Sequence, residues 1–196
     1  MAAGGEPVAG DINEPPEEAQ AEKVWGQLLE GIRKVYSSNR TGMSKGDYMR
    51  LYSCVYNYAV NTSWHSIMTK PPTGMHPELS SILELYERIK HFLATYLEGH
   101  SGKKVDLMND NVLRFYVSAW EEYRFSSTVL DGICDFVNRT WTERMQTAGQ
   151  AQFFRIYDLT LILWNRYIIS KFKEQITNSV LRLIEKARTE RTLTRD

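Results

Sequence analysis

The sequence has little of what marks a secreted or membrane-spanning protein. It contains two cysteines in 196 residues, Cys54 and Cys134, and both lie in apolar stretches, as small buried side chains do. No stretch approaches the roughly 18 consecutive apolar residues of a transmembrane helix. Residues 1–20 lack the basic start and the apolar run of a signal peptide. We therefore expect a protein of the reducing cytoplasm and nucleus that does not associate with membranes.

An excess of one charge is also missing. The 24 Lys and Arg residues balance the 24 Asp and Glu residues, whereas a nucleic-acid-binding protein usually carries a basic excess or a basic stripe. Catalytic motifs are absent as well, because the sequence has no glycine-rich phosphate loop, no GxSxG elbow, and no CxxC or HExxH pair with metal-ligand spacing. The histidines are scattered. We therefore expect no nucleic-acid partner, no enzymatic activity, no cofactor and no metal site.

Turn-forming residues are concentrated in a few segments that divide the chain. Residues 1–20 hold three prolines, three glycines and no basic residue, a composition that cannot bury a core and predicts a disordered acidic tail. Further turn-rich breaks lie at 37–42, 63–77, 99–104 and 147–149. Between the breaks, apolar residues recur at spacings of three and four, which is typical of amphipathic helices. The sequence therefore predicts an all-α fold.

The same patterns give approximate helix boundaries. The first helix is expected from Ala21 to just before Ser37, and the second from Ser44, which can cap it, to Thr62. The remaining expected boundaries are a third helix from Leu79 to before Gly99, a fourth capped by Asn109 or Asp110, a fifth from Ser126 or Ser127, and a last helix from about Gln152 towards Arg188.

The second predicted helix has the most unusual composition. A ridge along it is formed by residues spaced four apart: Tyr48, Tyr52 and Tyr56. A second apolar line beside the ridge consists of Leu51, Val55 and Tyr58, and Met49 and Cys54 widen the apolar arc. Such a helix is either wholly buried, or buried on one half and a docking surface on the other. Tyrosine and methionine are frequent in protein interfaces, but spacing alone leaves both interpretations open.

The fifth predicted helix carries a smaller apolar pair outside its core stripe. Val129 and Phe136 lie seven residues apart on one face, with Gly132 between them, so that a partner would be able to approach closely there. Packing of the same pair against a neighbouring helix explains the pattern equally well.

These residues lie in stretches that resemble the N-terminal region of cullins, most closely that of the cullin in the SCF ubiquitin ligase. The run WEEYRFSSTVLDGIC, residues 120–134, is especially specific. The similar stretches are VWGQLLEGIRKVY (24–36), YMRLYSCVYNYAV (48–60), LELYERIKHFLATYL (83–97), DLMNDNVLRFYVSAWEEYRFSSTVLDGICDFVNRTW (106–141) and QITNSVLRLIEKAR (175–188).

The resemblance implies a five-helix cullin repeat over 21–150 and the start of a second repeat over 151–196. It also implies a non-catalytic scaffold of an SCF-type E3 ubiquitin ligase. In that family the second and fifth helices bind a Skp-type adaptor with a BTB/POZ-like fold, which carries an F-box substrate receptor. The residues expected to bind the adaptor here are Tyr48, Met49, Tyr52, Val55, Tyr56 and Phe136.

The resemblance is incomplete, because whole cullins are several times longer than these 196 residues. The family's C-terminal part, which holds a RING protein and carries a modifier-accepting lysine, has no counterpart here, so the RING subunit is not expected to bind this chain. Two other functions stay open. One is a truncated cullin-like protein that competes for the adaptor. The other is a purely structural helical domain whose tyrosines belong to the core.

Overall fold

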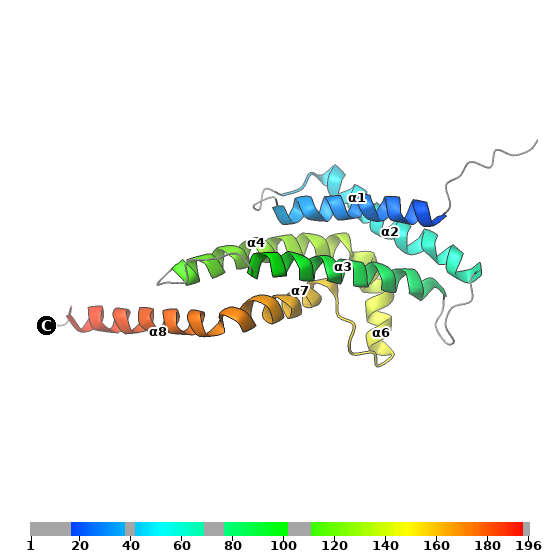
Figure 1. The fold of residues 1–196 in the computed structure, drawn as a ribbon. Helices are drawn as coiled ribbons and strands as arrows, with labels where there is room; N and C mark the ends of the chain where they lie inside the picture. Colours follow the sequence, from blue (N-terminus) through cyan, green and yellow to red (C-terminus); the bar gives the residue numbers. More distant parts are fainter. Residues whose placement is uncertain (1–16, 38–41, 69–76, 102–110, 194–196) are drawn as a thin grey trace, which may run out of the picture.

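The computed structural model describes residues 17–37, 42–68, 77–101 and 111–193. Within these ranges the chain forms helices and turns and no strand, which confirms the prediction of an all-α fold (Figure 1). The predicted tail lies outside the described residues apart from 17–20, which are helical rather than disordered. The elements are α1 (Glu17–Ser37), α2 (Lys45–Met68), α3 (Pro77–Ser101), α4 (Asn111–Ile133), α5 (Asp135–Val137), the π-helix η1 (Asn138–Thr142), α6 (Glu143–Thr147), α7 (Ile156–Trp164), the π-helix η2 (Asn165–Ile169) and α8 (Ser170–Leu193).

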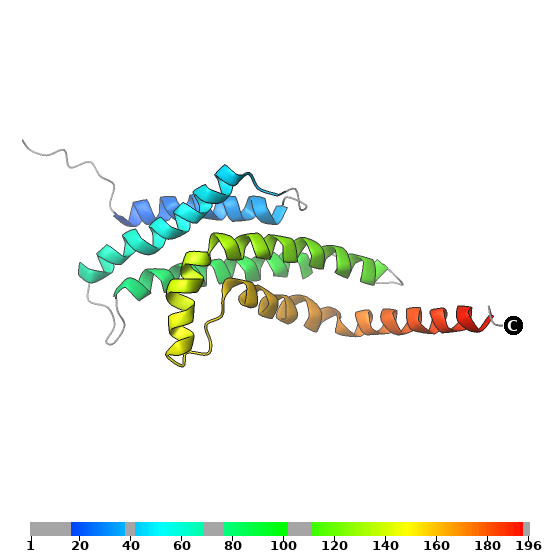
Figure 2. The same ribbon diagram turned by 180° about the vertical axis from the view of Figure 1, so that it is seen from behind.

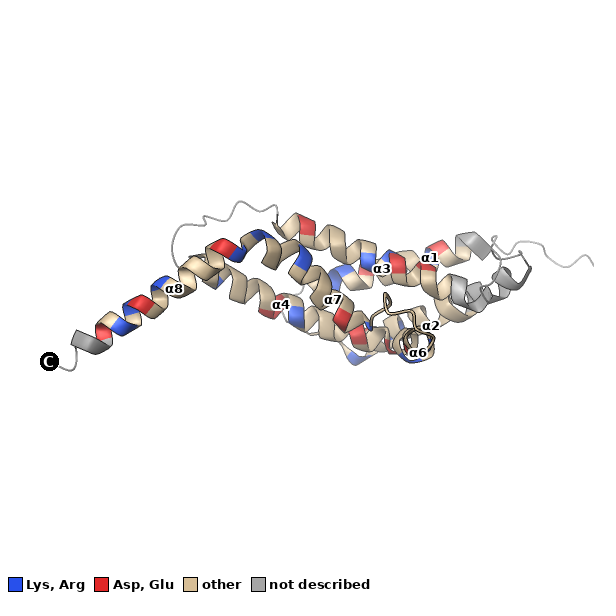
Figure 3. Ribbon diagram, turned by 90° about the horizontal axis from the view of Figure 1, so that it is seen from below, with Lys and Arg blue, Asp and Glu red and all other residues tan. Residues whose placement is uncertain are grey.

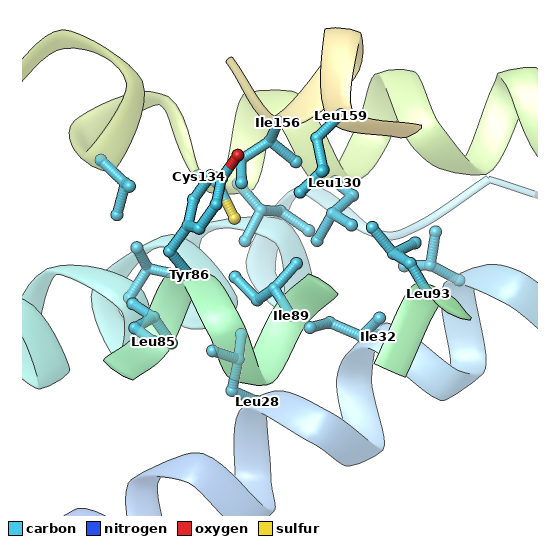
Figure 4. Packing of buried hydrophobic residues seen from close by; sticks show 14 of the residues in the cluster. Leu28, Ile32, Leu85, Tyr86, Ile89, Leu93, Leu130, Cys134, Ile156 and Leu159 are labelled. Atoms are coloured by element: carbon cyan, nitrogen blue, oxygen red, sulfur yellow. The ribbon is translucent and has the colours of Figure 1, made fainter. Parts of the chain in front are cut away.

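The helices are stacked in layers. The pair α1 and α2 covers one side of α3 and α4, and α7 runs along the other side (Figures 1 and 2). Apolar side chains from all these helices form one core cluster, in which Leu28 and Ile32 of α1 lie near Ile89 of α3 (Figure 4). Ile156 and Leu159 of α7 belong to the same cluster. The predicted domain boundary at residue 150 therefore coincides with no gap in the core, and it stays a prediction.

The start of α2 agrees with its predicted cap. The backbone amide of Asp47 donates to Ser44 Oγ at 3.1 Å, and the Ser44 hydroxyl donates to Asp47 Oδ2 at 2.7 Å. This is the arrangement that satisfies free amides at a helix N-terminus. The end of α2 differs, since the helix continues beyond Thr62 to Met68.

The predicted loop at 63–77 is therefore wrong at both of its ends. Residues 63–68 contain no proline or glycine and stay helical. Pro77 begins α3, where its missing amide hydrogen costs nothing. Residues 69–76 lie outside the described part of the chain, as do Asn109 and Asp110, the predicted caps of the fourth helix.

The predicted break before Ser126 is also wrong, because α4 continues to Ile133. Serines are common helix caps, which is why they suggested a boundary. In the fold both are buried inside the helix and bond to α1. Ser126 Oγ donates to the carbonyl of Val35 at 3.0 Å, and the hydroxyls of Ser127 and Tyr36 lie 3.2 Å apart. The chain turns only after Ile133, where α5, η1 and α6 run steeply away from α4 (Figure 2).

The last predicted helix begins at Ile156 rather than near Gln152. The first backbone amides of α7 donate hydrogen bonds to one side chain of α4 and one of η1. The Ile156 amide donates to Asn138 Oδ1 at 2.9 Å, and the Tyr157 amide donates to Asp131 Oδ1 at 3.0 Å. Asn138 Nδ2 in turn donates to Asp131 Oδ1 at 2.8 Å. The N-terminus of α7 is thus fixed by two side chains distant in sequence.

The π-helical turn η2 keeps one side of this last helix facing the bundle. Residues spaced four apart in an α-helix drift by about 40° per step, but a π-helical turn is wider and takes up that drift. A run with this spacing is buried across η2: Thr160, Trp164, Ile168 and Phe172. Beyond it, α8 extends past the ends of α3 and α4, with positive and negative residues interspersed along it (Figures 1 and 3).

Candidate functional site

Helix α2 has one buried face and one open face. The buried face holds Leu51 and Tyr58, each with 2% of its surface exposed, whereas on the open face Met49 is 50% and Tyr56 44% exposed. Tyr48 and Tyr52 are partly exposed between the two faces. The helix is therefore half buried, and the tyrosine ridge lies on the half that solvent reaches.

The prediction that Val55 contacts a partner is corrected by its burial. Its side chain has 0% exposed surface and packs in the core. Val55 lies on the same line of α2 as Leu51, whose side chain fills the space above Gly31 of α1. The spacing of apolar residues identified this line, but it did not predict that the line packs in the core.

The open face of α2 is supported by the end of α4 and by α5. The rings of Tyr56 and Phe136 meet edge to face, with their centroids 5.0 Å apart. About two turns before Tyr56 on α2, the phenol of Tyr48 crosses Gly132, so closely that a Cβ there would lie 2.5 Å from Tyr48 Oη. The structure thus brings the two predicted elements together. We call the resulting patch the tyrosine surface, which consists of Tyr48, Met49, Tyr52, Tyr56 and Phe136.

Gly132 corrects one detail of the sequence-based interpretation. The small residue between Val129 and Phe136 was expected to admit a partner, but the group that approaches it is Tyr48 of the same chain. Of the two possibilities for the apolar pair, packing against a neighbouring helix is therefore correct for Phe136, which contacts Tyr56 of α2. Part of the Phe136 side chain nevertheless stays exposed.

Charged groups beside the tyrosine surface are already paired within the chain. Asp47 holds Arg50 at 3.0 Å, and Asp135 holds Arg139 at 2.7 Å. Burial raises the pKa of the Tyr48 phenol, and the nearby carboxylate of Asp135 raises it further. The phenol is therefore protonated near neutral pH. The surface offers a partner apolar area and phenol hydroxyls rather than net charge.

A shallow pocket at the N-terminal end of α2 was not anticipated from the sequence. It lies between α1, the start of α2 and α4. Phe125 and Val129 lie four residues apart, and this spacing, which places two apolar side chains on one face of a helix, would have indicated the pocket. The apolar residues and the glycine that line it are Gly31, Val35, Met43, Leu51, Phe125 and Val129.

Within residues 17–37, 42–68, 77–101 and 111–193, no three His, Cys, Asp or Glu side chains are grouped so that they would hold a metal ion. None of the helices in the described part of the chain is long and apolar enough to cross a membrane.

Comparison with known proteins identifies the family. Residues 25–196 match the model of the Cullin alpha solenoid domain. The chain belongs to the cullin family. Cullin-1 of Caenorhabditis elegans is 28% identical over 178 residues, which cover 86% of this chain and 23% of that protein. Cullin-1 of Dictyostelium discoideum is 28% identical over 167 residues, covering 84% and 22%.

A third relative is Cell division control protein 53 of Saccharomyces cerevisiae, 25% identical over 181 residues, covering 85% of this chain and 21% of that protein. The chain thus spans less than a quarter of these relatives' length. The cullin match includes α2 to α8 and most of α1, so the whole tyrosine surface lies inside it.

Proposed function

We propose that this chain is the substrate-side part of a cullin scaffold and that it binds a Skp-type adaptor carrying an F-box protein. In this proposal the chain performs no chemistry itself. It holds the adaptor in place within a cullin-RING ubiquitin ligase of the cytoplasm and nucleus. Because it spans less than a quarter of its relatives, recruitment of the RING subunit is left to parts of a full-length cullin beyond these residues.

The tyrosine surface is the observation that carries the proposal. Large aromatic side chains and methionine supply wide contact area at little conformational cost, and they dominate the binding energy of many interfaces. Here Tyr56 rests on Phe136 and Tyr48 rests on Gly132, so both rings are held in place before a partner arrives. A surface already ordered in the free protein loses less entropy on binding.

A purely structural role accounts for this arrangement less well. It fits Tyr58, which is buried in the core, but not Met49 and Tyr56, which keep about half of their side-chain surface in water. The competitor hypothesis uses the same surface in the same way, because competition for the adaptor also requires binding to it.

The test is a binding measurement with a recombinant Skp-type adaptor in complex with an F-box segment. Wild-type chain should form a complex that survives gel filtration and gives a dissociation constant by calorimetry. Replacing Tyr48→Ala together with Met49→Ala should weaken binding at least about 100-fold, since two central anchors are each worth about 2 kcal/mol. The melting temperature should stay within a few degrees of wild type.

A matched control removes two exposed apolar side chains from elsewhere. Val117 is 50% and Ile162 42% exposed, on α4 and α7. Val117→Ala with Ile162→Ala should leave adaptor binding unchanged. Lack of wild-type binding at tens of micromolar adaptor would exclude the proposed function. Unfolding of the Tyr48→Ala, Met49→Ala variant would instead support the structural interpretation.

A further inference from the structure

Gly132 occupies an unusual position on α4. A Cβ added there would lie 2.5 Å from Tyr48 Oη, whereas the next atoms of the same ring, Cζ and Cε2, would lie at the ordinary distances of 3.5 and 3.6 Å. The conflict is therefore with a single atom, the phenolic oxygen. It would be relieved by moving the end of one side chain rather than the backbone.

The backbone conformation of α4 does not require a glycine at position 132. Glycines that end helices typically adopt a positive φ, but among the described glycines only Gly42 and Gly149 do so. Gly132 costs the helix about 1 kcal/mol relative to alanine. In contrast, Gly26 of α1 has no atom within 4 Å of an added Cβ. The three atoms nearest to an added Cβ at Gly132 thus all belong to one group, the Tyr48 phenol.

We propose that Gly132 is a positioning residue for the tyrosine surface: by leaving room for the Tyr48 phenol, it sets the ring orientation that the partner binds. This inference rests on the proposed function. Any side chain at position 132 swings the Tyr48 ring off α4 and into the space that the partner needs. The fold tolerates that movement, because the displaced atom is the far end of a partly exposed side chain.

The binding test uses four variants of the full chain with the Skp-type adaptor and F-box segment. Gly132→Ala should weaken binding at least about tenfold while its melting temperature stays within a few degrees of wild type. Gly26→Ala is the control and should bind as wild type does. Combining Gly132→Ala with Tyr48→Phe removes the one conflicting oxygen, so the double variant should bind as tightly as Tyr48→Phe alone.

Two results would overturn the inference. One is Gly132→Ala binding as tightly as wild type. The other is a double variant that binds more weakly than Tyr48→Phe alone, because the defect would then come from the backbone and not from the Tyr48 hydroxyl.

A second measurement does not depend on the partner. In protein labelled with ¹³Cζ-tyrosine, the Tyr48 signal is assigned by its loss in Tyr48→Phe. Gly132→Ala should shift this signal and lower the pKa of Tyr48 towards its ordinary value, because the phenol leaves the partly buried position beside Asp135. Gly26→Ala should do neither. If wild type fails to bind the adaptor, the proposed function falls, and this signal alone decides whether Gly132 orients Tyr48. An unchanged signal would refute that role.

Discussion

Helices α2 and α8 have the same length, 24 residues each, yet the fold holds them differently. Helix α2 packs against α1, α3, α4 and α5. Helix α8 contacts α4 and η2 near its start, and its second half extends beyond the ends of α3 and α4 (Figures 1 and 2). Both helices nevertheless expose large apolar side chains, so exposure alone does not distinguish them.

The exposed residues differ in kind and in support. On α2 they are aromatic rings and a methionine, and the rings rest on Gly132 of α4 and Phe136 of α5. On α8 they are aliphatic: Val180, Leu181, Leu183 and Ile184, between 40% and 57% exposed. Rings supported from beneath present a fixed shape, which is what specific recognition needs. The candidate site on α2 is therefore distinguished from the apolar residues of α8 by the support that its side chains receive from neighbouring elements, more than by their exposure.

The largest effect should come from making the same substitution in both helices. Leu51 of α2 is 2% exposed and Leu181 of α8 is 57% exposed. Leu51→Ala should reduce the free energy of unfolding by about 2–5 kcal/mol, because it leaves a cavity against α1. Leu181→Ala should change it by less than about 0.5 kcal/mol. Urea unfolding followed by circular dichroism measures both, and equal losses would refute the contrast between the helices.

A smaller effect should follow from loosening the start of α7, which leads into α8. Asn138 is 0% exposed and joins the Ile156 amide to Asp131. Asn138→Ala leaves that amide without its acceptor and should cost about 1–3 kcal/mol. Hydrogen exchange should accelerate in α7 more than in α2. The exposed Asn57 of α2 provides the control, and Asn57→Ala should alter neither quantity. Equal acceleration in α2 and α7 would contradict a local role for Asn138.

The smallest effect should appear at high pH and should involve α2, since α8 contains no tyrosine. Burial, assisted by the nearby Glu84, raises the pKa of Tyr58 from 10.0 to about 12. Between these values the unfolded chain has lost the Tyr58 proton while the folded chain keeps it. The stability that Tyr58 contributes is therefore fully present below about pH 10 and is lost as the pH rises towards 12.

Tyr58→Phe should make that decline shallower, by at most about 1.4 kcal/mol per pH unit for one proton. Urea midpoints between pH 8 and pH 11.5 measure the slope. Tyr56→Phe, on the open face of α2, should leave it nearly unchanged. A slope in Tyr58→Phe as steep as in wild type would show that Tyr58 does not contribute to the decline.

Local patterns predicted what depends on local interactions. Ser44 caps α2 as expected, and the apolar spacing located most of the helices. The break at Ser126 was wrong because its hydroxyl bonds to Val35, 91 residues away. Likewise the start of α7 depends on Asn138 and Asp131, which are 18 and 26 residues away from their bonding partners. No local spacing contains such information.

The candidate site divides in the same way. The four-residue spacing of Tyr48, Tyr52 and Tyr56 placed them on one ridge, and Phe136 does meet Tyr56. That these residues bind an adaptor stays a prediction. Val55 was misassigned because periodicity separates two lines on a helix without saying which one the core covers. The fit of Tyr48 over Gly132 depends on how two helices cross, which the sequence of neither helix specifies.

The π-helical turn η2 has a consequence for how sequences of this kind diverge. Each residue advances an α-helix by about 100°, so losing or gaining one residue within Asn165–Ile169 would rotate all of α8 about its own axis while the helix itself remains intact. A one-residue gap here, which an evolutionary comparison would treat as a trivial length change, would turn Leu181 and Ile184 towards a different neighbour. The number of residues in η2 therefore determines which side of α8 faces the rest of the fold.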